Sequence, residues 1–231
     1  MTARTRRGEK RLLAFPVYPG VTPLDLVGPL TVLRNLTGTA YRTVVVAEST
    51  DRLPTDTALR LVPAATFAEV PAPYAVIVPG GGPATVAAMA DDALVGYVRS
   101  AADKAQIVGA TGNGALILAA AGLLTGRRAA AHWAYAQRLE SHGVTWARER
   151  WVEDGRFLTA AGGGAGIDAM LALLARLKSR SAAGLAQLFM EYDPEPPFGP
   201  LGPDRGDPGL GALLRNPRRR AAHTDHPAEE R

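Results

Sequence analysis

"QIVGATGNGALILAAAGLL", residues 106–124, joins a short apolar run to a turn and then to a longer run of small apolar residues. The first run, residues 106–111, predicts a buried strand, and the second predicts a tightly packed helix. Strand, tight turn and helix in this order form the corner at which many α/β enzymes hold a nucleophile. Here the corner holds Gly112 and Asn113, with no cysteine and no serine. The stretch therefore predicts an α/β fold whose chemistry differs from that of a nucleophilic elbow.

Strands and helices are expected to alternate along the chain. Continuous Val- and Ile-rich runs predict strands at residues 11–18, 41–49, 74–82 and 106–111, with further strands in residues 143–163. Helices are expected at residues 23–36, 83–104, 134–142 and 165–180, and residues 53–70 read as irregular with one short strand. Alternation with buried strands predicts an α/β flavodoxin-like or Rossmann-type three-layer sandwich. Its sheet is mainly parallel, with helices on both faces.

The formal net charge of +4 is concentrated at the two ends of the chain. Residues 12–200 are close to neutral, and no basic face or recognition motif accompanies the charge, so no nucleic-acid partner is expected. We expect a basic disordered tail over residues 1–11 and one α/β domain over residues 12–198. Residues 199–231, rich in Pro, Gly and charge, predict a largely disordered second tail.

Composition excludes several kinds of site. The chain has no cysteine, which rules out disulfides, thiolate ligands and cysteine nucleophiles. The four histidines are scattered, so no metal site is expected. "PGGGPA", residues 79–84, lacks the glycine spacing of a nucleotide loop, so no cofactor is expected. Neither a transmembrane run nor a signal-peptide core is found, which predicts a cytoplasmic protein without membrane contact.

Three motifs fall at predicted strand ends: residues 19–25, 79–82 and 111–114. Ligands of open α/β sheets bind at the carboxyl ends of the strands, near the point where the strand order reverses. The three motifs therefore predict a pocket for a small molecule, without naming a reaction.

Several longer stretches carry a family resemblance. "FPVYPGVTPLDLVGPLTVL", "VIVPGGGPA", "GALILAAAGLLTGRRAAAHW", "DGRFLTAAGGGAGIDAMLALL" and "EYDPEPPF" occur in this order between residues 12 and 198. Together they resemble the DJ-1/PfpI superfamily, which is class I glutamine amidotransferase-like, and in particular its isonitrile hydratase-like branch. The resemblance implies the same α/β fold and a homodimer.

The elbow departs from the pattern of that family, which reads roughly Ser-Val-Cys-Thr-Gly-Ala. The family's cysteine maps onto Gly112 and the threonine after it onto Asn113. The acidic residue that pairs with the cysteine maps onto Asp25, and the oxyanion-hole region onto Gly80 and Gly81. Covalent isonitrile hydration, glyoxalase-type chemistry and peptidase activity all need the thiol, so the resemblance does not extend to them.

Gly112 has two interpretations. Glycine relieves the strained backbone of an elbow, which fits a decayed, inactive member of the family. The emptied volume also fits a substrate larger than the family norm. Asn113 is expected either to cap the following helix or to contact a polar substrate. The amides of Gly81, Asn113 and Gly114 are expected to steady a carbonyl or enolate oxygen.

Asp25 stands in the apolar setting "TPLDLVGP". It serves either as a capping group or, with its pKa raised by burial, as a general acid or base. We place the chemistry first on Asp25, then on Asn113 and His132, although a lone histidine is also often structural. Further substrate-binding positions are expected among the residues around the elbow: Tyr18, Gly80, Gly81, Thr111, Gly112, Gly114 and Trp133.

Two functions remain open from the sequence. The first is a cysteine-independent enzyme of the hydratase/lyase, isomerase or cyclase type, acting on a small organic molecule, with bacterial secondary metabolism suggested by the Ala-, Gly- and Arg-rich composition. The second is an inactive small-molecule sensor or scaffold. Burying a carboxylate in an apolar pocket costs free energy, which brings no benefit to a passive binder but is useful to an enzyme. We therefore favour the enzyme.

Overall fold

The computed structural model describes residues 10–197. The chain divides into two units, Met1–Met190 and Glu191–Arg231, and every helix and strand described below belongs to the first. Most of the two predicted tails lies outside the described residues. Arg11, which the sequence placed both at the end of the tail and at the start of the first strand, is the first residue of that strand. Its amide donates to Ala40 O (2.7 Å), and its guanidinium lies over the rings of Tyr41 and Tyr74.

A seven-stranded sheet in the order β10-β11-β7-β6-β1-β2-β5 forms the centre of the unit. Every pairing in it is parallel except that of the edge strand β10 with β11. Two small pairs, β3 with β4 and β8 with β9, lie outside it. The strands are β1 (Arg11–Pro16), β2 (Tyr41–Ala47), β3 (Leu53–Pro54), β4 (Arg60–Leu61), β5 (Ala65–Thr66), β6 (Ala75–Val78), β7 (Ile107–Ala110), β8 (Arg128–Ala129), β9 (Thr145–Trp146), β10 (Trp151–Asp154) and β11 (Phe157–Ala160).

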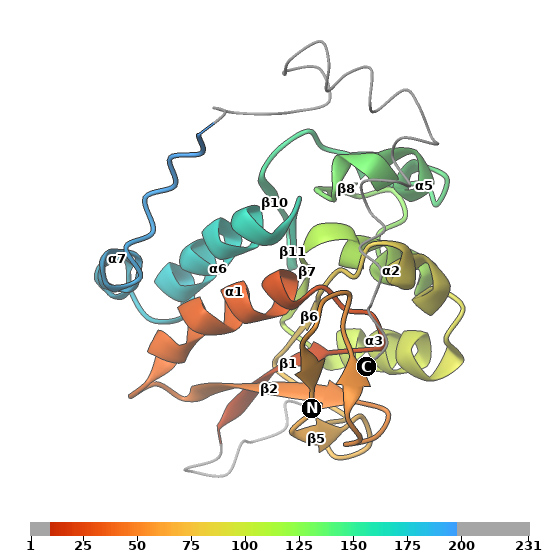
Figure 1. Ribbon diagram of the computed structural model, residues 1–231, viewed down its shortest axis with the longest axis horizontal. Helices are drawn as coiled ribbons and strands as arrows, with labels where there is room; N and C mark the ends of the chain where they lie inside the picture. The colour runs from red at the N-terminus through yellow and green to blue at the C-terminus, as the bar shows by residue number, and fades with distance from the viewer. Residues whose placement is uncertain (1–9, 198–231) are drawn as a thin grey trace. The chain divides into compact units, whose positions relative to one another are not determined.

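Helices cover both faces of the sheet: Figure 1 shows α1, α6 and α7 on one side and α2, α3 and α5 on the other. The helices are α1 (Pro23–Leu33), α2 (Pro83–Ala88), α3 (Asp92–Lys104), α4 (Ala115–Ala120), α5 (Ala136–Glu140), α6 (Gly163–Leu177) and α7 (Arg180–Phe189), with 3-10 turns η1 (Arg34–Leu36), η2 (Gly112–Gly114) and η3 (Trp133–Tyr135). This arrangement confirms the predicted α/β three-layer fold with a mainly parallel sheet.

The strands divide their side chains between two cores. Ala14, Val76 and Val108 point into the core under α3 and α4, whereas Leu13 and Ile77 point into the core under α1 and α6. Successive residues of a strand face opposite sides of the sheet. A strand covered on both faces is therefore apolar throughout, and this explains why these strands read as continuous apolar runs.

Three local predictions needed correction. The single helix expected over residues 83–104 is two helices, because the Asp91 side chain accepts from the Leu94 amide (3.0 Å) and starts α3 anew. The irregular segment 53–70 contains β3 and β4 as well as β5. Helix α7 was not predicted; it begins where Ser179 accepts from the Ala182 amide (3.1 Å).

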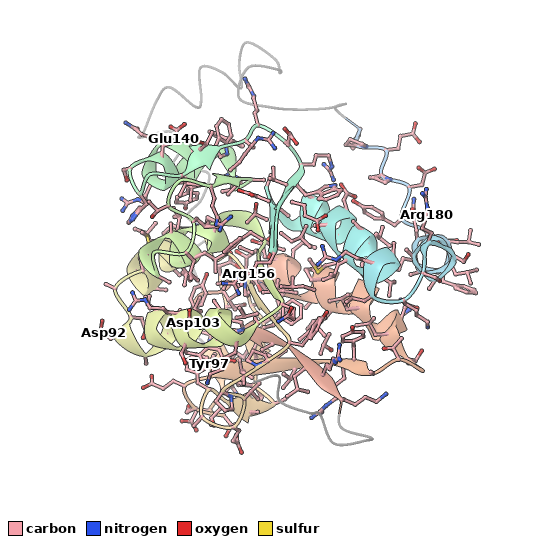
Figure 2. All side chains as sticks on the ribbon, turned by 180° about the vertical axis from the view of Figure 1, so that it is seen from behind. Asp92, Tyr97, Asp103, Glu140, Arg156 and Arg180 are labelled. Atoms are coloured by element: carbon pink, nitrogen blue, oxygen red, sulfur yellow. The ribbon has the colours of Figure 1, made fainter. Side chains whose placement is uncertain are left out.

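Arg156 fixes the end of the sheet that lies away from the elbow. Its guanidinium donates to Ala102 O (2.5 Å) and Ala105 O (2.8 Å) at the end of α3, and it lies 5.4 Å from the Phe157 ring centroid (Figure 2). Ala102 is in the last turn of α3, whose carbonyls have no partner within the helix, and Ala105 is the residue that follows the helix. Arg156 therefore joins α3 to the amino end of β11, whereas the site lies at the carboxyl ends of the strands.

Candidate functional site

The carboxyl ends of β1, β6 and β7, three neighbouring strands, bring the three predicted motifs together. The Thr22 amide donates to Gly80 O (2.8 Å), which joins the loop after β1 to the loop after β6. The Thr111 amide donates to Val78 O (3.0 Å), which joins β6 to the elbow after β7. The site thus lies at the switch point where α/β sheets hold ligands.

The elbow is a sharp turn that depends on glycine at two positions. Gly112 has φ of +58°, in the left-handed region that favours glycine. At Gly114 an added Cβ would overlap Val78 O and lie 2.9 Å from Pro79 O, so this glycine is required by the close approach of β6. The His132 amide donates to Gly112 O (3.3 Å) and supports the turn from a third segment.

The Asp25 carboxyl group fills the space left by the absent side chain at position 112. A Cβ built on Gly112 would overlap Asp25 Oδ2 and lie 2.9 Å from Asp25 Cγ. The side chain reaches this place from the first turn of α1, and the residue is only 7% exposed. The cleared volume predicted to hold a larger substrate is therefore occupied by a carboxyl group of the protein.

Burial raises the pKa of Asp25 from 3.8 to about 6. The Gly80 amide opposes this change by stabilising the carboxylate, and the negative charge of Asp56 adds to it. A carboxyl group with a pKa near 6 is mostly ionised at pH 7, with about a tenth of the molecules protonated. Both forms needed for general acid and general base chemistry are then present at neutral pH.

Asn113 is buried, and its side chain joins the elbow to the loop after β6. Its Oδ1 accepts from the Gly81 amide (3.1 Å) and from Thr85 Oγ1 (3.0 Å), while its Nδ2 donates to Gly82 O (2.6 Å). It makes no capping bond to η2 or α4. Asn113 therefore fixes the glycine loop instead of capping the helix.

Two of the three amides expected to steady an oxyanion already have acceptors. The Gly81 amide donates to Asn113 Oδ1, and the Gly114 amide donates to Thr111 O (3.0 Å). The third amide, that of Asn113, faces Gly80, where an added Cβ would lie 2.8 Å from its nitrogen. The predicted three-amide oxyanion site is thus largely satisfied from within the protein.

Thr111 is fully buried, and its hydroxyl group holds the first turn of α1. Its Oγ1 donates to the backbone oxygen of Asp25 (2.7 Å). Its Cγ2 lies against α6, 3.0 Å from a Cβ built on Gly166. Thr111, expected to contact substrate, is therefore a residue that positions Asp25.

Tyr18 and Thr85 extend the buried polar network below the loop after β6. Tyr18 OH lies 2.9 Å from Pro79 O and 2.8 Å from Thr85 Oγ1, and Thr85 in turn reaches Asn113. Both residues are at most 2% exposed, and burial raises the pKa of Tyr18 well above its ordinary value. Tyr18 thus supports the loop as a neutral hydrogen-bonding group.

His132 and Trp133 lie at the rim of the elbow. The His132 side chain is exposed, and its Nδ1 accepts from the Ala134 amide (3.3 Å) at the start of η3. The Trp133 ring is partly buried, 5.4 Å from the His132 ring between centroids. Tyr135, which the sequence did not single out, places its hydroxyl 3.9 Å from a Cβ built on Gly82.

Asp56, also missed, is the second carboxylate of the site. It lies in the loop between β3 and β4, where Thr22 Oγ1 donates to its Oδ2 (2.5 Å) and its amide donates to Val21 O (3.3 Å). Its charge raises the pKa values of both Asp25 and Tyr18. No sequence signal marks it, because long-range contacts with residues 20–22, including the bridge between Val21 and Thr55, bring this loop to the site.

Two kinds of feature are absent from residues 10–197. No group of three or more histidine, aspartate or glutamate side chains is placed to bind a metal ion there. Over the same residues, every helix is too short or too polar to cross a membrane.

Comparisons with known proteins agree with the fold. The chain is 37% identical over 213 residues to an isonitrile hydratase of Pseudomonas putida, covering 91% of this chain and 90% of that protein. A ThiJ/PfpI family protein from Pseudomonas syringae has a TM-score of 0.83 and 32% identity, over 93% of this chain and 90% of its own. Drosophila melanogaster DJ-1beta shares the fold, with a TM-score of 0.72 and 16% identity over 80% of this chain and all of its own. Residues 11–176 match the DJ-1/PfpI family, and the chain belongs to it.

Proposed function

We propose that this protein is a cysteine-independent enzyme that adds water to, or removes water from, a small organic molecule by proton transfer through Asp25. The observation that carries the proposal is the Asp25 carboxyl group, which lies where the side chain of residue 112 would otherwise project. An acid–base group then stands in the position that a nucleophile takes in thiol-dependent members of the family.

The site supports a two-step hydration. In the protonated form, Asp25 donates its proton to the substrate and becomes a carboxylate. Water adds to the resulting electrophile, and the carboxylate takes one proton from the added water, which restores the acid. The substrate gains one H and one OH in total, and the enzyme returns to its starting state. A pKa near 6 suits both transfers, because neither protonation state is costly at neutral pH.

The relationship to an isonitrile hydratase supports the hydratase class. A simple alkyl isonitrile is therefore the first probe substrate, and its hydration product is the N-alkyl formamide. Isomerisation and ring closure use the same kind of proton transfer. A second test in a metabolite extract therefore detects these reactions as well.

The test compares the wild-type protein with Asp25→Asn, with Asp103→Asn as the matched control. Asp103 is exposed on α3, near the amino end of β7 and thus at the opposite edge of the sheet from the elbow. Each protein is incubated with the isonitrile and with extract, and NMR and untargeted mass spectrometry follow the products.

We expect turnover by the wild type and Asp103→Asn, and a loss of at least about 100-fold in Asp25→Asn, within the usual contribution of acid–base catalysis. If a compound is bound but not converted by any of the three proteins, the enzyme proposal is wrong and the protein is a binding module. Equal turnover by wild type and Asp25→Asn would place the chemistry elsewhere.

A further inference from the structure

The hydrogen bonds around the elbow bear on the charge of the substrate. In acyl-transfer sites, backbone amides at this corner stabilise negative charge that develops on oxygen. Here the Gly81 amide is taken by Asn113 Oδ1 (3.1 Å) and the Gly114 amide by Thr111 O (3.0 Å). Two of the three donors expected to favour an anion therefore already have acceptors inside the protein.

Two carboxyl groups supply negative charge at the site. The Asp25 carboxyl group occupies the elbow itself, and Asp56 is anchored beside it through Thr22, whose amide also bonds Gly80 O. At the same edge of the sheet, the Arg150 guanidinium is paired with Asp168 (2.5 Å), so its charge is balanced. The field at the elbow therefore favours positive charge.

From this arrangement we infer that the site selects a substrate that carries positive charge or acquires it when Asp25 donates a proton, and that Asp56 contributes to this selectivity. The second alternative, a substrate that acquires positive charge, rests on the proposed function, because a substrate acquires this charge only by reacting. Protonation of a neutral molecule by Asp25 leaves a cation beside the newly ionised Asp25 carboxylate. The carboxylates of Asp25 and Asp56 together stabilise this cation better than one of them alone. Molecules with a carboxylate or phosphate at the reacting end are disfavoured by the same charges.

Binding of two probes of similar shape and opposite charge tests the inference without any turnover. The probes are benzamidinium and benzoate, each titrated at pH 7.5 and equal ionic strength into the full-length protein. Chemical shifts of the Gly112, Asn113 and Gly114 amides report binding at the elbow. The variants are Asp56→Asn and, as a control with the same change in net charge, Asp103→Asn, which is labelled on α3 in Figure 2.

We expect benzamidinium to shift the elbow amides with a Kd at least about tenfold below that of benzoate. Asp56→Asn is expected to raise the benzamidinium Kd about threefold to tenfold, as loss of a nearby, partly screened charge does. Asp103→Asn should leave it within about twofold. The inference is wrong if benzoate binds at least as tightly, if Asp103→Asn matches Asp56→Asn, or if neither probe reaches the elbow at about 10 mM.

The two proposals fail separately. Turnover that survives Asp25→Asn contradicts the proposed function but leaves the charge preference of the elbow in place. A preference for benzoate contradicts the charge inference, while turnover that depends on Asp25 still supports the enzyme.

Discussion

Replacing Gly112 with alanine tests whether Asp25 fills the elbow. Two separate costs follow from the structure. The left-handed φ of +58° costs any residue with a Cβ about 1–2 kcal/mol. The new Cβ also overlaps Asp25 Oδ2, and forcing a buried group aside adds about 1–3 kcal/mol. We therefore expect Gly112→Ala to lower the free energy of unfolding by about 2–5 kcal/mol.

Gly155 provides the matched control. Its φ is +63°, nearly that of Gly112, and a Cβ built on it meets nothing within 4 Å. Gly155→Ala should then cost only the backbone term, about 1–2 kcal/mol. In an Asp25→Ala background the overlap disappears, so Gly112→Ala should cost the same as the control. The coupling between positions 25 and 112 is expected to be at least about 1 kcal/mol.

Urea unfolding, monitored by the fluorescence of the three tryptophans, measures these differences in the free energy of unfolding. The packing argument predicts that Gly112→Ala is clearly less stable than Gly155→Ala, and that removing Asp25 closes the gap. Equal costs for the two alanine variants, unchanged by Asp25→Ala, would show that the carboxyl group does not lie in the elbow.

Three further predictions concern the same network. The stability difference between wild type and Asp25→Asn should shift against the wild type by about 2 kcal/mol as pH rises from 4 to 8. The folded pKa of about 6 lies above the ordinary 3.8, so the stabilising protonated form is lost over this range. Urea unfolding across the range checks this, and a constant difference contradicts it. Thr111→Val should lower the free energy of unfolding by about 1–2 kcal/mol, because the Asp25 carbonyl loses its donor. Thr111→Ser keeps a hydroxyl group and should recover most of that loss. Equal stability of the two variants would contradict the positioning role. Asn113→Ala should cost about 2–4 kcal/mol, since Gly81, Gly82 and Thr85 each lose a partner, and thermal unfolding showing no loss would contradict the network.

The fold was predictable because its signals are local and repeated. Buried parallel strands are apolar on both faces, so residues 75–78 and 107–110 can be recognised without knowledge of their neighbours. The glycines of the elbow likewise indicate a sharp turn. The break between α2 and α3 was missed because a single side chain, that of Asp91, decides it.

The sequence predicts which residues belong to the candidate site, but only partly how they are arranged in it. Strand ends placed Asp25, Gly80 and Gly112 together, and the structure brings them into contact. Their spacing along the chain does not reveal that Asp25 enters the space above Gly112, or that Asn113 takes up the Gly81 amide. Asp56 lies in a loop that long-range contacts with residues 20–22 bring to the site, so no local pattern could have found it.

The most direct measurement of the central claim is the pKa of the Asp25 carboxyl group in the intact protein. Carbon-13 NMR of protein labelled at aspartate, assigned with Asp25→Asn, gives its titration curve. A midpoint near pH 6, which moves down in Asp56→Asn and stays in place in Asp103→Asn, is the expected result. A midpoint near the ordinary 3.8 would show a solvated carboxylate, and Asp25 would then be unsuited to acid–base chemistry at neutral pH.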